Sequence, residues 1–175
     1  YNGRMNQKLF VLIIEGTTRP ERQSIHAAKY IESLAKTRSD IEVELIEPGQ
    51  FSLPFDGNDS ENKDPRYTSL TARADAFFIV TPEYNHSFPG TLKRLLDSEL
   101  ENYSHKAIAF AGVSNGGWGG VRAIESLIPV TRQLGLSPLS VDVHFPRIQD
   151  LFDANGEILP EHVERYSSLI NRVLD

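Results

Sequence analysis

The chain has 175 residues, a formal net charge of −6 and no cysteine. A sequence pI of about 5.4 argues against a nucleic-acid-binding protein, because such proteins usually carry a basic surface. The absence of thiols excludes disulfides, thiolate catalysis and zinc–sulfur sites. No apolar run has the roughly 18 residues of a membrane helix, and no signal peptide is recognisable. We therefore expect a cytoplasmic protein with neither nucleic acid nor membrane as a partner.

Predicted strands and helices alternate along the chain. The strands are expected at residues 9–14, 41–47, 77–80, 105–113 and 136–144, and the helices at residues 25–37, 69–74, 89–97, 119–134 and 161–173. This rhythm indicates an α/β domain with a parallel sheet, right-handed crossovers and helices on both faces. Five such strands fit the three-layer, flavodoxin-like order 2-1-3-4-5, whose ligand site lies where the strand order reverses, between the first and third strands. We expect one domain over residues 1–175, with a leader at residues 1–8.

The loop after the first strand, Gly16–Ser24, has the chemistry of a phosphate site. It opens a helix whose first N–H groups are unpaired and whose end is partly positive. It also carries hydroxyl, amide and guanidinium groups, on Thr17, Thr18, Arg19, Gln23 and Ser24. We expect Arg19 to be the cation of this site, because Arg22, one turn further on, can point to solvent. The alternative is ordinary helix capping with an incidental arginine.

The loop after the third strand is the second candidate. Pro82 is expected to end the strand because it has no N–H to donate, and the polar residues Glu83, Tyr84, Asn85 and His86 follow it. Ligands of open α/β sheets bind at the carboxyl ends of the strands, and this loop is longer than most such connections. An ordinary strand-to-helix connection is the alternative, and His86 could either touch a substrate or stabilise the loop.

The loop after the fourth strand, residues 114–120, contains four glycines and Trp118. Glycines let the backbone approach a ligand closely, although a flexible turn is the alternative. Residues 112–116 also match the G-x-S-x-G elbow of serine hydrolases, with Ser114 as nucleophile, Asp142 as acid and His144 or His162 as base. A serine hydrolase is therefore one alternative function.

The missing motifs narrow the choice of ligand. Neither the dinucleotide pattern G-x-G-x-x-G nor the Walker pattern follows the first strand. A mononucleotide whose flat ring reaches from the first loop to residues 82–86 fits better.

Four segments resemble one family: residues 16–20, residues 80–93, residues 119–123 and residues 153–157. They are similar to the NADPH-dependent FMN reductases, which are flavodoxin-fold quinone, azo-dye and chromate reductases. Two positions depart from the family pattern, because Asn115 stands where many members have an aromatic residue and Trp118 replaces a small one.

The resemblance implies FMN as cofactor and NADPH or NADH as electron donor. It implies hydride transfer to the flavin and then to a quinone-, azo- or metal-oxyanion-type acceptor, or to free flavin, with no catalytic side chain and no metal. The phosphate would lie at the loop Gly16–Ser24 and the flavin ring along residues 82–85. The pyrimidine side of the ring would lie at the loop of residues 114–120. The implied contacts are Gly16, Thr17, Thr18, Arg19, Gln23, Ser24, Pro82, Glu83, Tyr84, Asn85, Ser114, Asn115, Gly116 and Gly117.

The resemblance also implies a homodimer or homotetramer whose neighbours help to wall the flavin site. The apolar loop residues Phe51, Leu53, Phe55 and Phe88 would suit such an interface, or would pack on their own domain. A non-enzymatic electron carrier shares the fold and is a further alternative. Such carriers are usually more acidic and typically lack an arginine like Arg19.

Overall fold

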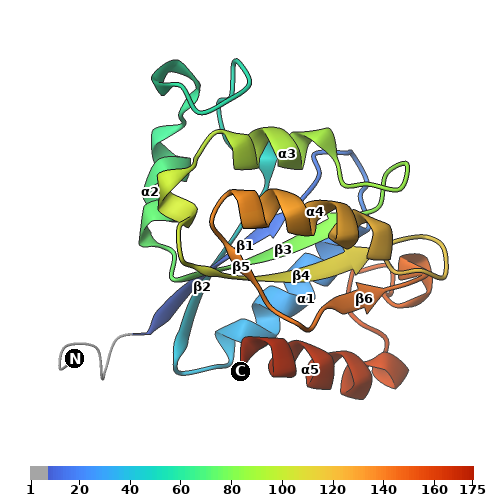
Figure 1. Cartoon of the computed structure of the whole chain (residues 1–175). Coiled ribbons are helices and arrows are strands. Elements are labelled where there is room, and N and C mark those ends of the chain that lie inside the picture. The colour runs from blue at the N-terminus through green and yellow to red at the C-terminus, as the bar shows by residue number, and fades with distance from the viewer. Residues whose placement is uncertain (1–7) are drawn as a thin grey trace.

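A computed structural model describes residues 8–175, so the leader expected at residues 1–8 lies almost entirely outside them. A parallel sheet forms the centre, with the order β2-β1-β3-β4-β5 and β6 also paired to β4 (Figure 1). The strands are β1 Leu9–Glu15, β2 Ile41–Ile46, β3 Ala76–Pro82, β4 Ala107–Val113, β5 Ser137–Pro138 and β6 Val143–Phe145. The α-helices are α1 Ser24–Lys36, α2 Pro65–Arg73, α3 Gly90–Asp97, α4 Val121–Gln133 and α5 Pro160–Leu174. The predicted strand order is confirmed.

The helices cover the sheet in two layers, with α2, α3 and α4 on one face and α1 and α5 on the other (Figure 1). Alternation along β1 explains why both faces are buried. Leu12 and Ile14 pack into the cluster beneath α2, α3 and α4, whereas Val11 and Ile13 pack into the cluster beneath α1 and α5. Successive side chains of a strand point to opposite faces, so an almost continuous apolar run serves both cores.

The predicted fifth strand, residues 136–144, is wrong as a single element. It is divided into β5, which pairs with Ala107 and Ile108, and β6, which pairs with the other end of β4 at residues 111–113. Pro138 is not the cause of the division, because the Ser137 and Leu139 N–H groups on either side of it donate to the Lys106 and Ile108 carbonyls of β4, both at 2.9 Å. The chain leaves β4 beyond Leu139 and returns at Val143.

Helix α2 begins at Pro65, four residues before the predicted start. The Asp64 side chain accepts hydrogen bonds from the backbone N–H groups of Arg66 and Tyr67, at 2.9 and 3.3 Å. An aspartate N-cap followed by proline at the first helical position is a standard helix start.

Among residues 8–175, no helix combines the length and apolar character needed to cross a bilayer.

Candidate functional site

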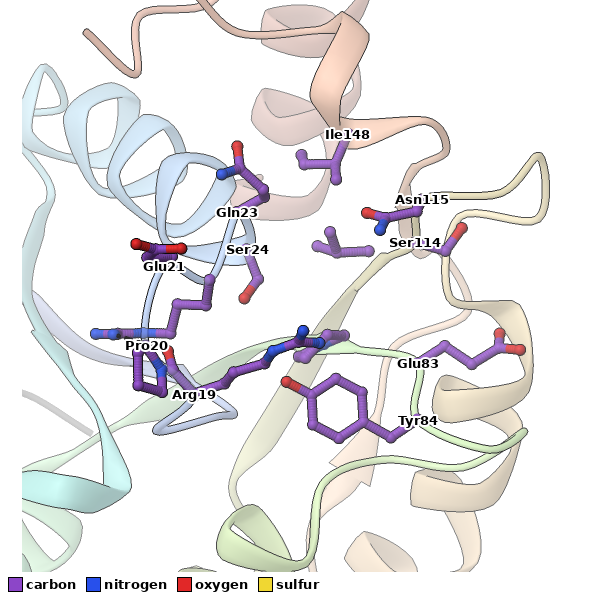
Figure 2. A pocket seen from close by; sticks show the side chains of 13 residues that line it. Arg19, Pro20, Glu21, Gln23, Ser24, Glu83, Tyr84, Ser114, Asn115 and Ile148 are labelled. Atoms are coloured by element: carbon purple, nitrogen blue, oxygen red, sulfur yellow. Dashed lines mark hydrogen bonds between the residues drawn. The ribbon is translucent and has the colours of Figure 1, made fainter. Parts of the chain in front are cut away.

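An open cleft lies at the carboxyl ends of β1, β3 and β4, where the strand order reverses (Figure 2). Its volume is about 310 Å³, within the range of roughly 300–1,000 Å³ for small-molecule sites. The lining residues come from three loops and one later segment: Arg19, Pro20, Glu21, Arg22, Gln23, Ser24, Pro82, Glu83, Tyr84, Val113, Ser114, Asn115 and Ile148.

Arg19 supplies the cleft with a cation. Its side chain extends from the β1–α1 loop toward the Tyr84 ring (Figure 2). Within residues 8–175, its guanidinium forms no hydrogen bond or ion pair. The nearby N-terminus of α1, which begins at Ser24, adds a partial positive charge. This corner therefore has the character of an anion site.

Glu15, the last residue of β1, lies behind this corner and is fully buried. Its carboxylate accepts hydrogen bonds from the Ser24 hydroxyl at 2.5 Å, from Arg22 Nε at 3.1 Å and from the Thr17 backbone N–H at 3.2 Å. Burial raises the pKa of Glu15, and the hydrogen bonds from Ser24 and Thr17 and the charge of Arg22 partly oppose that rise.

Arg22 does not point to solvent, although its position one turn beyond Arg19 allowed that orientation. Its guanidinium is held between the carboxylates of Glu15 and Glu47, and the exposed fraction of its side chain is 21%. No sequence pattern indicates this arrangement, because Glu47 follows β2, which is far from Arg22 along the chain but next to β1 in the sheet.

The loop after β3 forms a tight hairpin at the edge of the cleft. Tyr84 and Ser87 exchange backbone hydrogen bonds of 2.8 and 3.0 Å, and between them Asn85 and His86 have φ of 51° and 64°. Positive φ at both central residues is typical of a type I′ turn. The Tyr84 hydroxyl lies 3.1 Å from Thr17 Oγ1. This contact joins the first two loops.

Pro82 is the last residue of β3, but it does not stop the ladder. The Glu83 backbone N–H donates to the Val113 carbonyl at 3.0 Å, one position beyond Pro82. The Glu83 carboxylate points away from the cleft (Figure 2) and accepts from Arg122 Nη1 at 3.1 Å and from its backbone N–H at 3.3 Å. Arg122 lies over the ring of Trp118, at 5.4 Å from its centroid.

The glycines of the β4–α4 loop have two different roles. Gly119 and Gly120 are buried, with φ of 58° and 74°, and a Cβ on Gly112 would collide with the backbone of both. This pair therefore lets α4 pack closely on β4. A Cβ on Gly116 or Gly117 would meet no atom within 4 Å. Of the four glycines in this loop, Gly116 and Gly117 are therefore the two whose backbone a ligand could approach closely.

Ser114 has no hydrolase geometry. Its hydroxyl donates to the Gly116 carbonyl and accepts from the Gly119 N–H, both at 2.9 Å. His144 Nδ1 binds the Gly119 carbonyl instead, at 3.1 Å. Within residues 8–175, no histidine or aspartate is hydrogen-bonded to Ser114. Ser114 therefore holds the loop of residues 114–120 together by hydrogen bonds, although residues 112–116 match the G-x-S-x-G motif. The hydrolase alternative finds no support.

The structure brings the members of all three predicted loops to one cleft. Those that line it are Arg19, Gln23, Ser24, Pro82, Glu83, Tyr84, Ser114 and Asn115.

The other predicted contacts lie beside the cleft without lining it. Gly16 and Thr17 are buried beneath the first loop, and Thr18 is exposed. Asn85 is exposed in the hairpin, and Gly116 and Gly117 are exposed in the third loop.

Sequence reasoning missed Pro20, Glu21, Arg22, Val113 and Ile148 of the lining. Ile148 comes from a segment expected to be irregular. The backbone N–H groups of Arg147 and Ile148 donate to the carbonyls of Gly116 and Ser114, at 2.9 and 3.1 Å. No sequence pattern indicates such a tether. Glu15 could have been found from the sequence, because it is a charged residue at the end of an otherwise apolar strand.

Backbone strain gathers around the cleft. Apart from His105, the non-glycine residues with positive φ within residues 8–175 are Glu21, Asn85, His86 and Arg147. All four belong to the segments that line or adjoin the cleft. Such strain persists where the surrounding structure fixes it, and it is common at functional sites.

Comparison with known proteins agrees with this geometry. The profile of the family described as "NADPH-dependent FMN reductase" matches residues 9–150. The chain belongs to this family. A quinone reductase of Pseudomonas putida KT2440 is 33% identical, over 95% of this chain and 97% of the relative. A 2-hydroxy-1,4-benzoquinone reductase of a Burkholderia species is 29% identical, over 90% of each chain. Among solved structures, the flavoenzyme FerB of Paracoccus denitrificans matches with a TM-score of 0.78 at 22% identity, over 95% of this chain and 96% of that one; this supports the flavodoxin-like fold.

Membership of the FMN reductase family identifies the chain as an oxidoreductase that uses FMN with NAD(P)H as electron donor. The residues of the cleft fit that cofactor. The unpaired Arg19 and the start of α1 suit a phosphate, and Pro82, Tyr84 and Val113 supply apolar surface for a flat ring. The expected enzyme class and cofactor are confirmed.

Proposed function

We propose that this FMN reductase holds its flavin across the cleft and passes electrons from NAD(P)H to a small quinone-type acceptor. The observation that supports it is that Arg19, a cation without an ion-pair partner among residues 8–175, and the Tyr84 ring meet in one cleft, at the point where the strand order reverses. The names of the relatives favour a quinone over the azo, metal-oxyanion and free-flavin alternatives.

Each part of the cleft has a separate task in this proposal. Arg19 and Gln23 hold the phosphate end, with Gly16, Thr17, Thr18 and Ser24 beside them. The Pro82–Asn85 backbone orients the ring, and Ser114–Gly117 border its pyrimidine side. Bound FMN supplies the hydride chemistry. The protein leaves one ring face open, so that a nicotinamide or a quinone can stack at the roughly 3–3.5 Å needed for reaction. No side chain is assigned as acid or base.

The test is the absorption spectrum of the purified protein and the identity of its released pigment. We expect yellow protein containing FMN, or colourless protein that takes up added FMN and keeps it when free flavin is removed. NAD(P)H without air should bleach the colour, and a quinone should restore it. A flavodoxin-like carrier would bind FMN but would not be reduced by NAD(P)H. Failure to bind any flavin would overturn the proposal.

We further propose a cytoplasmic homodimer or homotetramer. Of the four apolar loop residues considered for an interface, Phe51 is buried, and Leu53 and Phe88 are partly buried against their own core. Phe55 remains 61% exposed. Phe55 is therefore the member of this group that is available to a second copy.

A further inference from the structure

Glu15 occupies groups that a phosphate would otherwise bind. The Glu15 carboxylate accepts hydrogen bonds from three donors at the β1–α1 loop: the Thr17 N–H, the Ser24 hydroxyl and the Arg22 guanidinium. The Thr17 hydroxyl is in turn bonded to Tyr84. Within residues 8–175, three polar side chains of this loop line the cleft and form no hydrogen bond or ion pair with another side chain: Arg19, Glu21 and Gln23. Of these, Arg19 and Gln23 can donate to a phosphate.

Carboxylates around this corner also weaken its attraction for an anion. Arg22 is matched by two carboxylates, Glu15 and Glu47, and Glu21 lies on the rim. Arg19 is therefore the cation of the lining that no carboxylate neutralises within the described residues. Because Glu15 is fully buried, water and salt screen its charge poorly. A phosphate at the start of α1 would meet this negative charge directly behind the donors.

We propose that Glu15 is a specificity-determining residue that limits how much the 5′-phosphate contributes to flavin binding. The inference rests on the proposed placement of FMN. It makes the flavin of this reductase readily exchangeable, because the ring contacts, Arg19 and Gln23 hold it, whereas the Thr17 N–H, the Ser24 hydroxyl and Arg22 are bonded to Glu15. Replacing Glu15 by the neutral Gln keeps the side-chain size and removes the like charge, so the phosphate should then bind more tightly.

The measurement is the ratio of riboflavin to FMN dissociation constants, by flavin fluorescence titration of the purified full chain. Riboflavin lacks only the phosphate, so the ratio isolates the phosphate contribution. We expect Glu15→Gln to raise the ratio by about tenfold and to slow FMN release. Glu47→Gln should raise it less, because the Glu47 carboxylate pairs with Arg22 at a partly exposed position. Glu44→Gln is the matched control, since Glu44 pairs with Arg66, and should leave the ratio unchanged.

An unchanged or lower ratio in folded Glu15→Gln would overturn the proposal and would make Glu15 a residue that positions the loop for the phosphate. If Glu15→Gln does not fold, Glu47→Gln decides. A ratio equal to that of Glu44→Gln then counts against the inference, and a higher one supports it. Failure of both flavins to bind the wild type would instead refute the proposed cofactor site.

Discussion

Arg19 and Arg22 lie three residues apart in one loop but have opposite surroundings. Arg22 is held by two carboxylates, whereas Arg19 extends unpaired into the cleft (Figure 2). Their spacing in the sequence does not determine this difference. It depends on Glu47, which the sheet brings next to the loop, and such long-range neighbours have no local signal. The position of Arg19 at the cleft was therefore predictable from its loop, and the pairing of Arg22 with two carboxylates was not.

Arg19→Ala should weaken FMN binding while riboflavin binding stays unchanged. A charge-assisted hydrogen bond contributes roughly 1.5–3 kcal/mol, which is about ten- to a hundredfold in affinity. The fold should be intact because Arg19 is exposed in a loop. Flavin fluorescence titration measures both constants.

Arg172→Ala is the control for Arg19→Ala. Arg172 is exposed near the end of α5. Arg38 is unsuitable as a control, because it forms ion pairs with Asp40 and Asp175. Equal FMN affinity for Arg19→Ala and wild type would mean that the phosphate lies elsewhere.

The titration of Glu15 should be visible in the stability of the protein. Burial raises its pKa above the ordinary value of 4.5, so the folded state holds the proton more firmly than the unfolded state. The free energy of unfolding should therefore fall as pH rises from about 4.5 through the folded-state pKa. Glu15→Gln cannot titrate and should lack this component. Urea unfolding of both proteins between acidic and neutral pH compares them, and a difference that is constant with pH would contradict the prediction.

At the scale of elements, the regular strands and helices followed from apolar periodicity, with two exceptions. The carboxylate cap at Asp64 extended α2, and this signal was present in the sequence. The last strand divides beyond Leu139, whose N–H still donates to the Ile108 carbonyl of β4, and no residue type marks that point in the sequence. The hairpin after β3 was less readable, because Asn85-His86 is not the Asn-Gly pair that usually marks a type I′ turn.

Replacing His86 tests whether its backbone conformation is strained. A left-handed conformation costs an ordinary residue roughly 1–2 kcal/mol, while glycine loses about 0.4–1 kcal/mol through its freer unfolded chain. His86→Gly should therefore match or exceed wild-type stability by up to about 1 kcal/mol. His86→Val should lower stability by about 1–2 kcal/mol, because β-branched residues tolerate positive φ poorly. Urea unfolding gives both values.

His105 provides a matched comparison for His86. It has the same φ of 64° but lies before β4, at the opposite edge of the sheet from the cleft. His105→Gly should change stability as His86→Gly does and leave flavin affinity untouched. A large loss of stability in His86→Gly would show that the imidazole, rather than the turn, holds this loop in place.

At the scale of the whole molecule, the strand order and the position of the cleft were predictable because parallel strands separated by helices allow few topologies. The assembly was not predictable in the same way. Large exposed apolar side chains are scattered over the described surface, including Phe55, Trp118 and Leu139, and single exposed apolar residues are normal on monomers. Whether any of them meets a second copy must be measured.

Phe55→Ser should shift the proposed oligomer toward smaller species. Phe55 is 61% exposed, and its carbonyl is held by Arg94 Nε of α3 at 3.2 Å, so the side chain is presented from an anchored loop. In a symmetric dimer each residue occurs twice. Loss of about 1.5 kcal/mol per phenylalanine should then raise the dissociation constant about a hundredfold. Sedimentation at micromolar concentration measures it. Leu139→Ser, beside the amino end of β4 and 41% exposed, is the control and should sediment as wild type does. A monomeric wild type would refute the assembly, and an unchanged Phe55→Ser oligomer would place its interface on another face.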